Sequence, residues 1–187
     1  MARSDVTPEE FEKLFQRLAP EVHHYLRRRV DAEADDLLAE VFVVAWRRRL
    51  DLPEESLRKA WLYGVARRLI LANARSAARS SATVAAVTQQ GHVSSTSDEE
   101  RESTVHRALA SLTAVDRDLI TLTVWEGLPV AEAAFSLGMR PGAARVRLHR
   151  ARKRLAANPE LAALTSQVAP LSSVSPEGAR ISSHGTE

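Results

Sequence analysis

The chain has 187 residues, enough for one or two small domains, and its aromatic share of 5 % predicts a core built mainly of Leu, Val and Ala. It contains no cysteine, which excludes disulfide scaffolds and thiolate metal sites, and no apolar run reaches the roughly 18 residues of a membrane span. Because the N-terminal residues are charged rather than apolar, we expect no signal peptide, no stable membrane association and a cytoplasmic location.

The N-terminal half shows helical periodicity. A helix is predicted from Thr7, which can cap it, with Pro8 in the first turn and Glu10 completing a capping box. Pro20 cannot keep the backbone bond of a helix interior, so we expect this helix to end there and a second to begin. Their apolar stripes are formed by Phe11, Leu14, Phe15 and Leu18, and by Val22, Tyr25, Leu26 and Val30.

A third helix is predicted from about residue 34, and a fourth from Leu57 to Arg75. The third begins with Asp35 and Asp36 and ends in Arg47-Arg48-Arg49, the charges that a helix dipole favours at its two ends. Phosphate contact is an equally good interpretation of the three arginines. Trp46 and Trp61 fall at helical spacing with apolar neighbours, which favours core packing over base stacking.

The composition changes between Ser76 and Thr104, where Ala, Ser, Thr and Gln replace Leu, Ile and aromatic residues. Such a segment cannot bury enough apolar surface to offset the cost of ordering. We therefore predict an all-α protein of two small helical domains, at residues 7–75 and 105–157, joined by a flexible linker at 76–104. Residues 158–187 are rich in Ser, Pro and Gly, and we expect a disordered tail.

The second domain has the spacing of a helix-turn-helix. One helix starts at Thr113 and ends near Gly127, a short one covers Val130 to Leu137, and Gly138 makes the turn before a helix from Pro141 to Leu155. Between Arg140 and Arg154 there are seven basic residues and no acidic one. A solvated basic helix would explain the charge alone, but the turn and the apolar stripe of the same helix favour binding to DNA.

The last of these helices has two different faces. Its predicted buried face is formed by Ala144, Leu148, Ala151 and Leu155. The opposite side presents residues suited to base edges and phosphates in a major groove, and Gly142 allows the backbone to approach a phosphate. The candidate DNA-binding residues are Gly142, Arg145, Val146, Arg147, His149, Arg150 and Lys153, beside Ala143.

An enzyme is not indicated. The six histidines are scattered, and no Gly-rich phosphate loop or nucleophile–base pair is present. The Asp35-Asp36 pair lacks further ligands at helical spacing, so a role at the helix start is favoured over a metal site. We expect no catalytic residue, metal or cofactor.

Motifs in both halves resemble those of extracytoplasmic-function (ECF) sigma factors of bacterial RNA polymerase. The first half resembles region two and the second half region four, in the same order and with a linker between them. The motifs are Asp35-Asp36-Leu37, Glu40-Val41-Phe42, Ala45-Trp46 and Trp61-Leu62-Tyr63-x-x-Ala66-Arg67, then Ala108-Leu109-x-x-Leu112, Arg117, Glu126-Gly127-Leu128, Ala131-Glu132-x-Ala134, Leu137-Gly138-Met139, Gly142 and Arg147-Leu148-His149-Arg150-Ala151-Arg152.

The resemblance implies a factor that binds core RNA polymerase, at its clamp and flap regions, and directs promoter recognition and opening. Region four would read the −35 element, with family contacts at Arg145, Val146, His149 and Arg150. Region two would bind the melted −10 element near Arg67 and Arg68. An anti-sigma factor is a further expected partner. The clamp contact would fall on Asp35, Asp36, Leu37, Glu40 and Val41.

Five positions depart from the family pattern. Arg68 stands where Asn is usual, and Ala72 where Asp or Asn is common, so no base-reading role is carried over to either. The others are Ala39 for Gln, Ala133 for Ile and Ala143 for Thr, the last removing a hydroxyl that could bond a phosphate.

Two alternatives remain open at this point. An ordinary helix-turn-helix regulator would bind duplex DNA without polymerase, usually as a dimer on paired half-sites. A sigma-like protein could act mainly by binding an anti-sigma factor, a possibility that the departures at Arg68 and Ala72 keep open.

Overall fold

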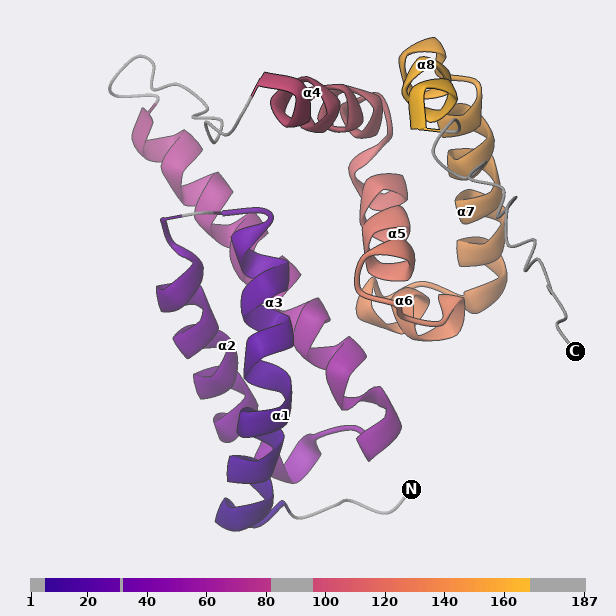
Figure 1. The fold of residues 1–187 in the computed structure, drawn as a ribbon. Coiled ribbons are helices and arrows are strands. Elements are labelled where there is room, and N and C mark those ends of the chain that lie inside the picture. The colour runs from indigo at the N-terminus through magenta and orange to yellow at the C-terminus, as the bar shows by residue number, and fades with distance from the viewer. Residues whose placement is uncertain (1–5, 31, 82–95, 169–187) are drawn as a thin grey trace, which may run out of the picture.

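The computed structural model of the chain describes residues 6–30, 32–81 and 96–168. Within these ranges it is all-α, as predicted, with one bundle formed by α1–α3 and a second by α4–α8 (Figure 1). The helices are α1 (Pro8–Arg27), α2 (Ala34–Arg47), the short 3-10 helix η1 (Arg49–Asp51), α3 (Glu55–Ser81), α4 (Thr96–Ala110), α5 (Ala114–Val124), α6 (Val130–Ser136), α7 (Pro141–Ala156) and α8 (Pro159–Val168).

Helix α1 begins as predicted but does not end at Pro20. Both bonds of the capping box form: the Thr7 amide donates to Glu10 Oε2 at 2.9 Å, and the Glu10 amide donates to Thr7 Oγ1 at 3.3 Å. The predicted break at Pro20 was wrong, because α1 continues through it to Arg27. Pro20 and Gln16 are both exposed, so the Gln16 carbonyl that lacks an amide partner can bind water.

A single apolar stripe explains why α1 stays intact. It buries Leu14, Leu18, Val22, Tyr25 and Leu26 against α2 and α3. Helices in proteins owe most of their stability to such packing. The free energy gained by burying this stripe over five turns outweighs the one backbone hydrogen bond that is lost at Pro20.

The two tryptophans of the first bundle, Trp46 and Trp61, differ in their burial. Trp61 packs half-buried against the core, as expected. Trp46 is 39 % exposed; its ring meets Phe11 edge-on at 5.0 Å, and the guanidinium of Arg49 lies 4.6 Å from its ring centroid. Trp46 therefore covers the edge of the bundle, and Arg49 covers part of Trp46.

Two helices extend into the segment predicted as a linker. Helix α3 continues past Arg75 to Ser81, and α4 begins at Thr96, so the expected flexible linker at 76–104 is too long at both ends. Ala and Arg in the sequence after Arg75 are good helix formers, and a helix already nucleated by packing extends at little cost. Residues 82–95 lie outside the described part of the chain.

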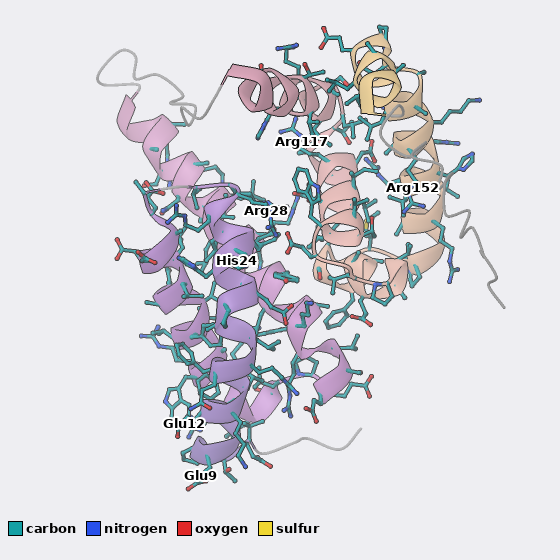
Figure 2. The ribbon with its side chains drawn as sticks, in the orientation of Figure 1. Glu9, Glu12, His24, Arg28, Arg117 and Arg152 are labelled. Atoms are coloured by element: carbon teal, nitrogen blue, oxygen red, sulfur yellow. The ribbon has the colours of Figure 1, made fainter. Side chains whose placement is uncertain are left out.

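The starts and turns of the second bundle follow the sequence. Thr113 Oγ1 accepts the Asp116 amide at 3.3 Å and caps α5. Gly127 and Gly138 both have φ of 66°, a left-handed conformation that glycine adopts readily, and they end the turns after α5 and α6. Arg117, visible below α4 in Figure 2, donates to the carbonyls of Leu109 and Ala110 at the end of α4.

Helix α8 contradicts the prediction that the chain is disordered from residue 158. Asn158 Oδ1 accepts the amides of Glu160 and Leu161 at 3.0 and 3.2 Å, which caps the new helix. Helix α8 packs against α4, where Arg107 pairs with Glu160 at 3.1 Å. The remainder of the predicted tail, residues 169–187, lies outside the described residues.

Tyr25 is a buried tyrosine whose hydroxyl has no hydrogen-bond partner among the described residues. Its ring lies between the Tyr63 ring, with centroids 4.9 Å apart, and the Arg29 guanidinium, 3.7 Å from the ring centroid. Burial raises the pKa of Tyr25 to about 12. The folded protein therefore keeps this proton at a pH where the unfolded chain, with a tyrosine pKa of about 10, has lost it.

Tyr25→Phe should leave stability at pH 7 unchanged or raise it by up to about 1 kcal/mol, because it removes a buried hydroxyl without a partner. The wild-type protein should lose stability as the pH rises from about 10 to about 12, since the unfolded state then binds fewer protons. Tyr25→Phe should make this loss of stability smaller. It should not abolish the loss, because burial also raises the pKa of Tyr63. Urea unfolding from pH 7 to 11.5 measures both effects; an identical pH slope in the two proteins contradicts the assignment.

Candidate DNA and polymerase interfaces

Helix α7 has the two faces that its sequence predicts. Ala144, Leu148 and Ala151 are buried against α5 and α6, and Leu155 packs half-buried beside them. The opposite side is exposed, with Val146 at 51 %. This exposed side carries Arg145, Val146, His149, Arg150 and Lys153. The basic residues among them make no ion pair within the described part of the chain, so their charge is available to a polyanion.

The start of α7 is open to an anion. Pro141 occupies the first turn, no acidic residue follows it, and the N-cap residue Arg140 makes no side-chain cap. A Cβ added at Gly142 would meet nothing within 4 Å, so packing does not require glycine there. The free amides and the helix dipole suit a phosphate at this end of the helix.

Arg147 differs from the other predicted DNA contacts. Its Nε donates to Asp116 Oδ1 at 2.8 Å and its Nη2 donates to Thr113 Oγ1 at 3.2 Å. Asp116 is buried, so Arg147 neutralises it and ties α7 to the start of α5. In the sequence, Thr113 and Asp116 indicate only a helix start, and their spacing from Arg147 does not reveal this pair.

The predicted polymerase-binding residues on α2 separate into an outer and an inner set. Asp35, Asp36 and Glu40 are exposed, whereas Leu37 and Val41 are 2 % and 0 % exposed. Leu37 and Val41 stand four residues apart on the side that packs against α1 and α3, so including them as contact residues was wrong; they position the acidic face. Asp35 Oδ1 lies 2.9 Å from His23 Nε2, beside a shallow pocket lined by Phe15, Pro20 and Leu38.

Basic residues gather where α2 ends against α3. Arg68 has no acidic partner among the described residues, and burial, together with the charges of Arg48 and Arg67, lowers its pKa. Such uncompensated charge suits a nucleic-acid backbone. Arg67 is already engaged: its Nε donates to Asp118 Oδ2 of α5 at 2.6 Å. Both residues lie at the predicted −10 site, but in this structure only Arg68 is available.

The second bundle also exposes three large apolar side chains that sequence reasoning missed. Val124 and Trp125 end α5, and Phe135 lies on α6, with exposed fractions of 58, 43 and 42 %. Exposed apolar residues of this size are typical of a protein-binding surface when they gather. Their position outside the buried stripe of each helix is the signal that would have identified them.

The described residues contain no group of three or more His, Cys, Asp or Glu that could hold a metal ion. Their helices include none with the length and apolar character needed to cross a membrane.

Comparisons with known proteins identify the family. The models of sigma-70 region 2 and sigma-70 region 4 match residues 14–80 and 103–155. The ECF RNA polymerase sigma factor SigL of Mycobacterium tuberculosis is 31 % identical over 124 residues, which cover 63 % of this chain and 70 % of SigL.

Solved structures share the fold. The sigma factor RpoE, solved with the anti-sigma factor NepR from Bartonella quintana, superposes with a TM-score of 0.60 at 22 % identity over 79 % of this chain and 94 % of that chain. CnrH, solved with the cytosolic domain of CnrY, gives 0.55 at 25 % identity over 86 % and 90 %. With regions two and four both matched in order, the chain belongs to the ECF family of RNA polymerase sigma factors, a class of transcription-initiation factors and not of enzymes.

Proposed function

We propose that this sigma factor reads the −35 promoter element with the exposed side of α7 and binds core RNA polymerase through the acidic side of α2. The observation that carries the proposal is the division of α7 into a buried apolar face and an exposed face of uncompensated charge. With the exposed side of α7 in the major groove, Arg145 and Arg150 would bind base edges or phosphates. His149 and Val146 would contact the DNA bases, and Lys153 and Gly142 would contact the DNA backbone.

In region two, the basic cluster of Arg48, Arg67 and Arg68 would bind the melted −10 strand. A single strand needs positive charge along its backbone, which Arg48 and Arg68 supply and which Arg67 would add once it is released from Asp118. Arg68 replaces the Asn usual in the family, and its charge supports a phosphate contact at that position. The −10 sequence of this factor would then differ from that of relatives with Asn.

The polymerase contact would be electrostatic at α2 and apolar in region four. Asp35, Asp36 and Glu40 form an acidic surface that basic residues of the clamp could meet. The exposed Trp125 and Phe135 suit an apolar segment such as the flap. Core polymerase exceeds this chain greatly in size, so two separate contacts would fix both regions on it.

An anti-sigma factor is the proposed regulatory partner. RpoE and CnrH, which share the fold, were each solved with a second protein, named an anti-sigma factor in the RpoE complex. We place this chain in the cytoplasm, where polymerase and promoter DNA are found. A regulator that binds DNA without polymerase would leave the region-two match without a role.

Binding to promoter duplex with and without core polymerase tests the proposal. The protein alone should bind a −35 duplex weakly and with strong salt dependence, whereas the protein with core polymerase should protect both promoter elements from cleavage. A scrambled duplex of the same length and base composition is the control. Tight, specific binding without polymerase would instead identify an ordinary helix-turn-helix regulator.

A further inference from the structure

Asp116 is a buried carboxylate that faces α7. It lies in the first turn of α5, and its side chain is only 11 % exposed. Its Oδ1 accepts from Arg147 Nε of α7 at 2.8 Å, and Arg147 is its one ion-pair partner within the described residues. Because a buried carboxylate without a partner is costly, the folded bundle favours the arrangement in which Arg147 points at Asp116.

Thr113 holds the same guanidinium group at a second point. Its Oγ1 accepts from Arg147 Nη2 at 3.2 Å and also accepts the Asp116 amide at 3.3 Å. A guanidinium group is planar and rigid, so bonds from both Nε and Nη2 determine how it is oriented. Helices α5 and α7 lie side by side (Figure 1), and these bonds join the start of α5 to the middle of α7.

Arg147 keeps donors for a partner outside the bundle. A guanidinium group has five N–H donors, of which Asp116 and Thr113 take one from Nε and one from Nη2. Both N–H groups of Nη1 and one of Nη2 are left without an acceptor among the described residues, and the side chain is 40 % exposed. A guanidinium group that is held at its inner edge and open at its outer edge suits an anionic acceptor such as a phosphate oxygen.

The position of Arg147 on α7 favours the DNA backbone over the bases. Ala143 lies one turn before it and Arg150 about one turn after it, so Arg147 stands at the edge of the exposed side and not at its centre. When a helix lies in the major groove, its centre meets base edges and its flanks meet the phosphates of the two strands. Ala143 has no side-chain donor, so a phosphate beside this part of α7 would meet Arg147.

We propose that Asp116 and Thr113 are positioning residues for promoter recognition, which hold Arg147 against a backbone phosphate of the −35 element. This inference rests on the proposed function, in which the exposed side of α7 enters the major groove. Arg145 and Arg150 make no ion pair among the described residues and must be ordered when DNA binds. Arg147 is ordered when the protein folds, so its contact with DNA avoids that entropic cost.

Neutral phosphates identify the contact. Holoenzyme formed from the full chain and core polymerase is titrated onto a promoter duplex in which single −35 phosphates are replaced, one at a time, by uncharged methylphosphonates. Wild-type holoenzyme should lose about tenfold in affinity at the phosphate that Arg147 contacts. Holoenzyme with Arg147→Gln should bind the unmodified duplex about tenfold more weakly and show no further loss at that phosphate. Arg107→Gln, which removes the arginine of the ion pair between α4 and α8, is the matched control and should keep the wild-type profile.

Two variants of Asp116 test the positioning role. Asp116→Ala removes a negative charge, which by electrostatics alone should strengthen binding to DNA. Because the orienting carboxylate is lost, binding should instead weaken by about threefold to tenfold. Asp116→Asn keeps an oxygen that can accept from Nε and should restore the affinity to within about twofold of the wild type.

Glu160→Ala, in the pair with Arg107, is the control for the change in charge and should not weaken binding. Circular dichroism at the assay temperature establishes that each variant is folded. The phosphate profile of Arg147→Gln decides the contact even if Asp116→Ala does not fold.

Two results would overturn the proposal. If holoenzyme with Arg147→Gln loses affinity at the same phosphates as the wild type, Arg147 makes no backbone contact and Asp116 only joins α7 to α5. Equal or tighter binding by a folded Asp116→Ala variant would show that Asp116 does not position Arg147. If wild-type holoenzyme fails to form or binds no promoter duplex, the proposed function fails, and the role of Asp116 and Thr113 in promoter recognition fails with it.

Discussion

Replacing Arg145 and Arg150 together with Ala lowers run-off transcription from a cognate promoter by about 100-fold and leaves binding to core polymerase unchanged. Each guanidinium is exposed and makes no ion pair within the described residues, so it does not support the fold. A contact between an arginine and a base or phosphate contributes roughly 1–3 kcal/mol, and the loss of two gives an effect of this size. Transcription and core binding are measured on the same protein preparations.

Arg154→Ala is the matched control for this double variant. It removes the charge of one arginine from the last turn of α7, beyond the residues proposed to bind the promoter. Its effect should be a few-fold at most and reflect only the weaker general attraction to DNA. An equal loss from Arg154→Ala, or a loss of core binding in the double variant, would show that α7 is not the reading helix.

Reversing two charges on α2, by Asp36→Lys with Glu40→Lys, lowers the affinity for core polymerase by about 10- to 100-fold. Both side chains are exposed, and like charges placed across an interface cost several kcal/mol in total. Binding of region four to a −35 duplex should not change. Because exposed charges are screened by salt, the difference from wild type should shrink between 50 and 300 mM salt, values chosen to span roughly a twofold change in Debye length.

Glu9→Lys with Glu12→Lys provides the comparison on α1. These residues are also exposed and acidic, and Glu9, like Asp36, lies in the first turn of its helix. This α1 variant therefore changes the net charge by the same amount, but away from the side of α2 that is proposed to bind the polymerase clamp. If both pairs reduce the affinity equally, the effect is one of net charge, and the α2 surface has no specific role.

The sequence predicts the local elements of this fold better than their ends. The cap at Thr113 and the turn at Gly138 depend on neighbouring residues, so both could be found without the fold. Pro20 was misread because the packing of the stripe around it, and not its own geometry, decides whether the helix continues. Helix α8 was missed although Asn158-Pro159-Glu160 is a start signal, because the polar composition beyond it dominated the interpretation.

The candidate site was predictable where one helix determines it. Periodicity alone assigns Arg145 and Arg150 to the outside of α7. It also assigns Leu37 and Val41 to the core, but the family motif that contains them drew them into the contact set. The partners of Arg147 and Arg67, at Asp116 and Asp118, come from another helix, and no spacing along the chain reveals which arginine an aspartate will meet.

Reconstituted transcription decides whether this protein directs initiation at promoters. Core RNA polymerase is incubated with this protein and with genomic fragments, and the 5′ ends of the transcripts are mapped. We expect transcripts that require the protein, start downstream of shared −35 and −10 sequences, and fall sharply with the Arg145→Ala and Arg150→Ala variant. Tight binding of the protein to duplex DNA without polymerase, together with no transcript from any fragment, would contradict this expectation.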